Sequence, residues 1–175
     1  MGEANRFLTL FTKELGLIRA SAQGIRQLRS KLRFGLQEFA LAEVVLVRGR
    51  EIWRITNAVP GKGALSGDRA VRFGRVGALL RRLVEAEVSQ PLLFDLLLQL
   101  QMLLQNPNLS TDEAQALETI TVMRTLSFLG YFSPVGELES YIENKPLSEI
   151  TPLSFLPLQS RAIALINQSL SATQL

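Results

Sequence analysis

The 175-residue chain contains neither cysteine nor histidine. Without cysteine there is no disulfide, thiolate metal site or thiol nucleophile, and without histidine the usual imidazole base and zinc ligand are missing as well. Tryptophan occurs once, at Trp53. These absences exclude the commonest zinc sites and the nucleophile–histidine pairs of many hydrolases.

Other catalytic patterns are also lacking. The carboxylate pairs Glu85/Glu87 and Glu137/Glu139 have i, i+2 spacing, which places the two acids on different faces of a helix. Neither a Gly-x-Ser-x-Gly motif nor an acidic calcium loop is present. Gly61-Lys62-Gly63 lacks the earlier glycine and the following Ser or Thr of a phosphate loop. We therefore expect a protein that is not an enzyme, with no cofactor and no metal ion.

Acidic residues are scarce in the first half of the chain. Residues 1–82 carry 16 Lys and Arg but six Asp and Glu, whereas residues 83–175 carry three and ten. Such asymmetry indicates a basic part that meets nucleic acid or an anionic membrane. The alternative is a chance partition of charge between solvated surfaces.

Long hydrophobic runs are absent too. The most apolar stretch, from Pro91 to Leu104, is interrupted by Asp95 and two glutamines and is too short to span a membrane. The N-terminus contains Glu3 and lacks the apolar core of a secretory signal. We expect a cytoplasmic protein that does not bind membranes.

The residues that are present predict an α+β fold. Runs at 7–12, 17–23, 39–47 and 51–56 have the composition of strands, and Arg48-Gly49-Arg50 forms a hairpin turn between the last two. Short strands at this spacing favour a small barrel or sandwich, and a barrel of the oligonucleotide/oligosaccharide-binding (OB) kind would suit the cations described below. We assign residues 1–59 to this barrel, residues 60–68 to a Gly- and Pro-rich linker, and residues 69–175 to an all-α domain.

In the α-helical part, the apolar stretch 92–104 predicts a buried central helix. Ser110 and Glu113 form a capping box for a helix that runs to Leu129. Pro157 is predicted to begin the last helix, because proline is favoured in a first turn.

The most informative stretch is the segment from Gly24 to Arg33, which holds four cations and no acid. Loops on a rigid barrel present such cations well to phosphate groups. Phe34 and Trp53 are candidates for stacking on bases, although Trp53 also suits the barrel core. The candidate DNA-binding residues are Arg19, Arg26, Arg29, Lys31, Arg33, Arg48, Arg50, Arg54, Arg75 and Arg82. For all of them the alternative is an ordinary solvated charge.

Several motifs of this basic half resemble the N-terminal half of RecO, a family of bacterial recombination mediators. Their order and spacing carry the resemblance over about the first 55 residues. The motifs are Gly2-Glu3-Ala4-Asn5, Leu8-Thr9-Leu10-Phe11-Thr12, Ala22-Gln23-Gly24, Arg29-Ser30-Lys31, Leu36-Gln37-Glu38-Phe39 and Arg48-Gly49-Arg50.

The resemblance implies an OB-fold barrel followed by a helical domain. It also implies binding of single- and double-stranded DNA, strand annealing, and assistance in loading RecA. The implied partners are RecR and the single-stranded-DNA-binding protein, with RecA reached indirectly, and the implied location is the nucleoid.

Three departures from the family pattern affect these expectations. One further strand usually precedes the Gly-Glu start, so that the barrel here is expected to be incomplete. The cysteines that hold zinc in some members are absent after Tyr131, so that no zinc is expected. Gln23 and Glu38 replace a basic residue and a proline. Adding an upstream strand should therefore raise the thermal unfolding temperature of the domain.

Two other functions fit the same residues. A protein-interaction scaffold would use the barrel to bind peptide, and its affinity would depend little on salt. A nuclease or other hydrolase would yield product in a metal-dependent cleavage assay. DNA binding instead weakens steeply with salt, with a log–log slope of about −0.7 per phosphate neutralised on single strands.

The basic segment generates the first prediction. Replacing Arg26, Arg29, Lys31 and Arg33 together by Ala should weaken DNA binding about equally for all sequences, because phosphate contacts carry no base information. Affinities measured on oligonucleotides of unrelated sequence test this. Loss of binding to one sequence alone would contradict it.

Overall fold

The computed structural model describes residues 6–25, 30–61, 63–134 and 136–172, and only the backbone of Lys31. The chain divides into two compact units. The first, the β unit, comprises Met1–Leu65 and Glu85–Pro91; the second, the helical unit, comprises Ser66–Val84 and Leu92–Leu175. This α+β organisation confirms the predicted fold class.

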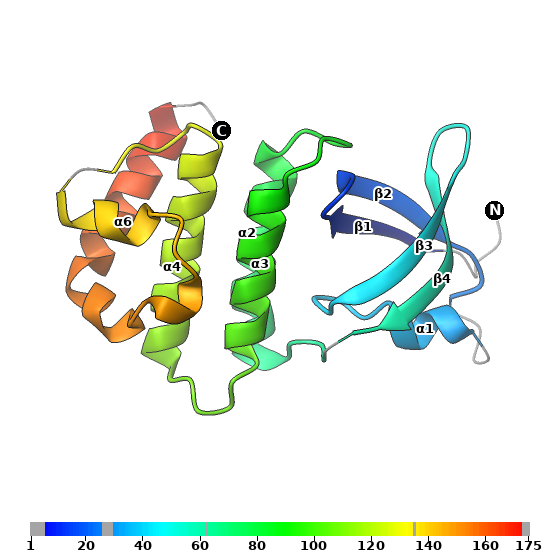
Figure 1. The fold of residues 1–175 in the computed structure, drawn as a ribbon, viewed down its shortest axis with the longest axis horizontal. Helices are drawn as coiled ribbons and strands as arrows, with labels where there is room; N and C mark the ends of the chain where they lie inside the picture. Colours follow the sequence, from blue (N-terminus) through cyan, green and yellow to red (C-terminus); the bar gives the residue numbers. More distant parts are fainter. Residues whose placement is uncertain (1–5, 26–29, 62, 135, 173–175) are drawn as a thin grey trace. The chain divides into compact units, whose positions relative to one another are not determined.

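The β unit is built from two antiparallel hairpins. β1 (Arg6–Thr12) pairs with β2 (Gly16–Ala22), and β3 (Ala42–Arg48) pairs with β4 (Trp53–Pro60). A short parallel pairing of β2 with β4 joins the hairpins into one curved sheet of order β1-β2-β4-β3 (Figure 1). β1 and β3 are therefore the edge strands of the described sheet.

One face of this sheet forms the core of the β unit. Ala20, Ala22 and Ile55 are buried there, and Leu8 and Leu46 of the two edge strands pack against them. The small alanines of β2 leave room for side chains from both hairpins within the curve of the sheet. A bulge between Val45 and Leu46 shifts the register of β3 on β4, which increases the local twist.

Helix α1 (Lys31–Gly35) covers the end of the sheet at which β2 and β4 terminate. Gly35 permits the close approach, because a Cβ atom there would lie 2.6 Å from the carbonyl oxygen of Ala58. Leu32 and Leu36 pack against the core from this side. The sequence predicted a continuous loop from Gly24 to Arg33, and this prediction is wrong at Lys31–Arg33, which lies in α1.

The helical unit contains α2 (Gly67–Leu83), α3 (Pro91–Leu104), α4 (Thr111–Phe128), α5 (Glu139–Ile142) and α6 (Pro152–Ala172), with single 3-10 turns at Gly136–Leu138 and Leu147–Glu149. The predicted capping box at α4 is confirmed: Ser110 accepts from the Glu113 amide, and Glu113 accepts from the Ser110 amide. These backbone and side-chain hydrogen bonds from Ser110 lower the pKa of Glu113.

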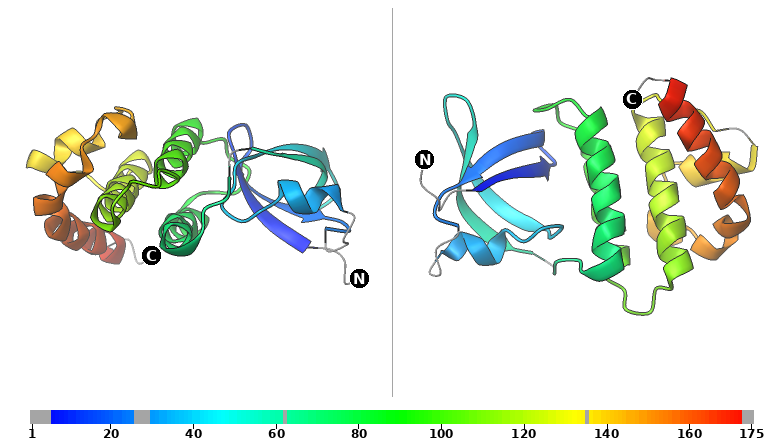
Figure 2. Two further views of the ribbon diagram at one scale, coloured as in Figure 1. Left: turned by 90° about the horizontal axis from the view of Figure 1, so that it is seen from below. Right: turned by 180° about the vertical axis from the view of Figure 1, so that it is seen from behind.

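Two predictions about the helices are wrong. The most buried helix is α4, which packs against α2 and α6 (Figure 2). In contrast, α3 leaves Leu92 and Met102 about half exposed. Helix α6 begins at Pro152, and Pro157 lies inside it. Pro157 is exposed near the helix start, where the carbonyl group that it leaves unpaired is accessible to water.

Arg124 is the largest completely buried side chain of the helical unit. It donates to the carbonyl oxygens of Tyr141 at 2.7 Å and Lys145 at 2.5 Å, which holds the α5 region on α4. Burial lowers the pKa of this guanidinium. No described helix combines the length and apolarity needed to cross a lipid bilayer.

The segment Glu85–Pro91, which follows α2 in the chain, packs with the β unit and not with the helical unit. Leu17 and Ala86 form a parallel β-bridge there. Gly16 is required, because its φ is 65° and a Cβ atom would lie 1.9 Å from the carbonyl oxygen of Val88. The sequence did not predict this return of the chain to the β unit.

Replacing Gly16 by Ala should therefore destabilise the β unit. We expect the free energy of unfolding to fall by about 1–3 kcal/mol from the left-handed backbone alone, measured by thermal or denaturant melts. Gly77 provides the control, because its Cβ position in α2 is open and alanine there should stabilise by about 0.5–1 kcal/mol. An unchanged Gly16→Ala variant would contradict the close docking of residue 88.

Candidate nucleic-acid interface

The outer face of the sheet carries an aromatic and cationic row. Alternation along the strands directs Phe7, Arg19 and Arg54 away from the buried alanines of β2. In the register, Phe7 lies opposite Ser21, and Ser21 lies opposite Arg54 on β4. The parallel pairing of β2 and β4 therefore brings cations from both hairpins to one surface, which we call the outer face (Phe7, Thr9, Arg19, Ser21 and Arg54).

Phe7 and Arg19 are in direct contact on this face. The guanidinium carbon of Arg19 lies 4.7 Å from the centroid of the Phe7 ring, within range of a cation–π interaction. Phe7 nevertheless remains 46% exposed. An exposed ring beside a planar cation offers a stacking surface together with a charge for phosphate.

The β3–β4 hairpin places further cations at the end of the sheet opposite α1. The turn is tight, with the Gly49 amide donating to the carbonyl oxygen of Ile52 at 3.0 Å. Arg50 is exposed at the turn. Arg48 lies over the ring of Trp53, 4.8 Å from its centroid.

The sequence left Trp53 as a candidate either for stacking on bases or for the barrel core. It packs against the core of the β unit, yet it is only partly buried and supports Arg48. Its indole N–H donates to Oε1 of Glu87 at 3.2 Å, and Arg48 donates to the same oxygen at 2.5 Å. The hydrogen bond from Arg48 is the main reason that the pKa of Glu87 lies below its usual value.

The basic segment is described only in part. Arg26 and Arg29 lie outside the described residues, and of Lys31 only the backbone in α1 is placed. Arg33 is exposed on α1, and the neighbouring Phe34 is 67% exposed.

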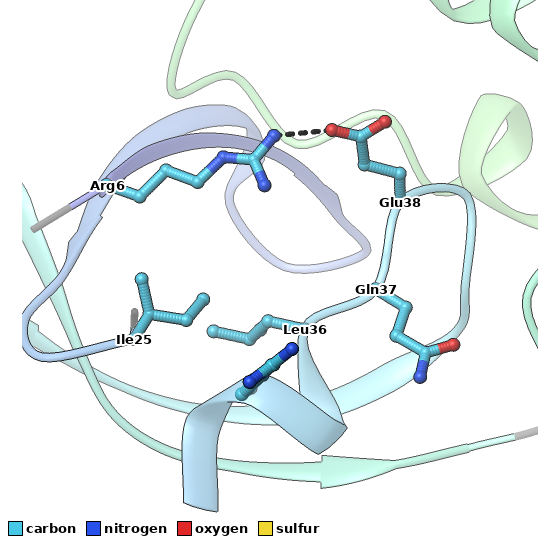
Figure 3. A pocket seen from close by; sticks show the side chains of 6 residues that line it. Arg6, Ile25, Leu36, Gln37 and Glu38 are labelled. Carbon is cyan, nitrogen blue, oxygen red and sulfur yellow. Dashed lines mark hydrogen bonds and ion pairs between the residues drawn. The ribbon is translucent and has the colours of Figure 1, made fainter. Parts of the chain in front are cut away.

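Arg33 also lines an open cleft of about 700 Å³ in the β unit (Figure 3). Ile25 and Leu36 supply its apolar side chains. Across it Arg6 of β1 and Glu38, which precedes β3, form an ion pair at 2.5 Å. Arg33 thus shares this cleft with a second cation, Arg6, which is paired with an acid.

The two candidates in α2, Arg75 and Arg82, belong to the helical unit. Arg75 makes two hydrogen bonds to Glu118, at 2.6 and 2.9 Å, which raise the pKa of its guanidinium. The same carboxylate accepts from the buried Arg72 at 3.1 Å. Arg82 is exposed, so that the two predicted cations differ: one is held in an internal ion-pair network and the other faces solvent.

Sequence reasoning missed Phe7, the aromatic residue of the outer face. The signal was present in the alternation of Phe7, Thr9 and Phe11 with Leu8 and Leu10. What could not be seen was the register that sets Arg19 beside Phe7. Among the residues that the structure describes, no three acidic side chains gather in a way that would hold a metal ion.

A curved sheet with an end helix and an aromatic, cationic outer face defines an OB-fold-like domain, here joined to a helical unit. Residues 1–63 match the family model described as Recombination protein O N terminal. This N-terminal part of the chain is therefore similar to the N-terminal region of the RecO family.

A relative shows the same likeness. Over 80 residues the chain is 40% identical to the "DNA repair protein RecO" of Heliobacterium modesticaldum. That match covers 45% of this chain and 29% of the relative. The aligned part thus spans less than a third of the relative's length.

Proposed function

We propose that this chain is a DNA-binding mediator of repair and recombination without catalytic activity. The observation that carries the proposal is the outer face, where Phe7 and Arg19 are in contact and Arg54 joins them from the second hairpin. Cations that follow a backbone and aromatic rings on which bases stack are the two components of single-strand binding. The name of the Heliobacterium relative, a DNA repair protein, supports the same role.

The position of this face in the fold is a second support. One strand precedes the present β1 in the family that the sequence resembles, so that β1 and β2 would correspond to its second and third strands. OB folds bind oligonucleotides with the face of those strands and with the loop between the fourth and fifth. The corresponding loop here is the hairpin turn that carries Arg48 and Arg50.

The broader role follows from the family. We propose that the protein binds single- and double-stranded DNA, promotes strand annealing and assists the loading of RecA. Its partners would be RecR and the single-stranded-DNA-binding protein, in the cytoplasm and associated with the nucleoid. The surplus of cations in residues 1–82 supports a polyanionic partner.

Fluorescence anisotropy with labelled single-stranded and duplex oligonucleotides over a salt series tests the proposal. Replacing Phe7 by Ala should weaken single-strand binding about fivefold or more, since each base–aromatic stack contributes about 1–3 kcal/mol. Val59→Ala removes an equally exposed apolar group without a ring and should leave affinity unchanged. Equal affinities for the wild type and Phe7→Ala would show that the outer face does not stack on bases.

Arg19 gives the complementary measurement. Arg19→Ala should weaken binding to all sequences alike and make the log–log salt slope shallower by about 0.7 on single strands. Arg161→Ala, which removes an exposed cation from α6, is the control for net charge. A salt-independent affinity in the wild type would favour the peptide-binding scaffold instead.

A further inference from the structure

The segment Glu85–Pro91, here called the strap, is held on the β unit mainly by polar contacts. The Glu87 amide donates to the carbonyl oxygen of Leu17 at 2.9 Å, and the Ser89 hydroxyl donates to that of Lys13 at 2.9 Å. All residues from Glu85 to Ser89 are exposed, including Val88 at 39%. A segment with exposed hydrogen bonds and little buried apolar surface opens at low free-energy cost.

Glu87 is the central residue of the strap. Its carboxylate reaches the hairpin, where Oε1 accepts from both Arg48 and Trp53. Its backbone has a φ of 61° although it is not glycine, a left-handed conformation that is strained for a residue with a side chain. Such strain persists only where the surrounding contacts impose it, and here the Leu17 hydrogen bond and the carboxylate contacts both do so.

The carboxylate occupies a site that suits a phosphate oxygen. Arg48 is stacked on the Trp53 ring with its Nη1 atom directed to Glu87, and the indole N–H converges on the same oxygen. A phosphate accepts the same charge-assisted hydrogen bonds that a carboxylate accepts. Both partners are still partly exposed, with 48% of the Arg48 side chain and 44% of the Glu87 side chain accessible.

We propose that Glu87 is an internal competitor for the nucleic-acid phosphate at the Arg48–Trp53 pair, and that single-stranded DNA displaces its carboxylate and loosens the strap. The inference rests on the proposed DNA-binding function and adds a regulatory contact to it. Under this inference, Arg48 becomes available only when a DNA phosphate replaces the Glu87 carboxylate. This displacement also makes the strap, which connects α2 to α3, respond to DNA bound by the β unit.

The first experiment compares Glu87→Gln with Glu85→Gln in the full chain. Both variants remove one negative charge from an exposed position of the strap, but only Glu87 contacts Arg48. We expect Glu87→Gln to bind a labelled oligo(dT) about threefold more tightly than the wild type, as expected for loss of an exposed ion pair. Glu85→Gln should change the affinity by less than about 1.5-fold, because it lowers the negative charge of the strap without removing a contact to Arg48.

The second experiment uses the unaltered chain. Hydrogen exchange of the Glu87 amide should become faster when oligo(dT) binds, because its bond to Leu17 opens, although ligands ordinarily protect a surface. The fluorescence of Trp53, the only tryptophan, should change on binding in the wild type and change less in Glu87→Gln. Unchanged or slower exchange of the Glu87 amide in the complex would overturn the inference.

The outcomes separate this inference from the proposed function. If the wild type and both glutamine variants fail to bind oligo(dT), the DNA-binding function itself is wrong, and the competition falls with it. If all bind and the two glutamine variants gain equally, or neither gains, the function stands and the role of Glu87 is rejected. Tighter binding by Glu87→Gln alone, together with faster amide exchange in the wild type, supports the competition.

Discussion

The β unit depends on the short parallel pairing between β2 and β4. Three residue pairs, from Ala20 with Trp53 to Ala22 with Ile55, join two hairpins that are otherwise paired only within themselves in the described part of the chain. Ala20 and Ala22 are completely buried at this junction, and larger side chains there would separate the hairpins. The candidate interface depends on the same pairing, because it sets Arg54 of one hairpin beside the strand that carries Arg19.

Charge excess alone overstates the surface available to a polyanion. In α2, Arg72 is buried between Asp68 and Glu118, and Arg75 shares the second of these acids. Arg69 donates to backbone carbonyl groups at and beyond the end of α3, including Leu104 at 2.8 Å and Leu109 at 3.0 Å. These arginines stabilise the helical unit. The cations of the β unit differ, because Arg19, Arg50 and Arg54 remain exposed on strands or at the hairpin turn.

The strap shows how chain connectivity can link a binding domain to the domain that follows. The chain passes between the two units after Leu65, after Val84 and after Pro91. The strap therefore has helices of the second unit at both ends, while its hydrogen bonds are made to β2, to the β1–β2 turn and to Arg48 and Trp53 of the second hairpin. A contact such as that between Glu87 and Arg48 can then connect events at the hairpin with the ends of α2 and α3.

Much of the fold was predictable from local patterns. The structure contains a strand close to each of the four predicted runs, the Arg48-Gly49-Arg50 turn and the capping box of α4. Each of these features depends on residues only a few positions apart. The resemblance to the RecO N-terminal region could be inferred in the same way, from motifs within the first 55 residues, and residues 1–63 match that family model. The start of α6 was not predictable by this reasoning, because two prolines compete for the first turn.

Local sequence patterns were enough to locate most strands and helices, although not α1, and the position of each cation along the chain. Only the tertiary structure decided which cations are free and which are engaged, since Glu118 and Glu87 are far in sequence from the arginines that they bind. It also decided that Phe7 faces outward beside Arg19 and that the chain returns to the β unit at residue 85. These features arise from strand register and from packing between distant segments, which no local pattern of residues encodes.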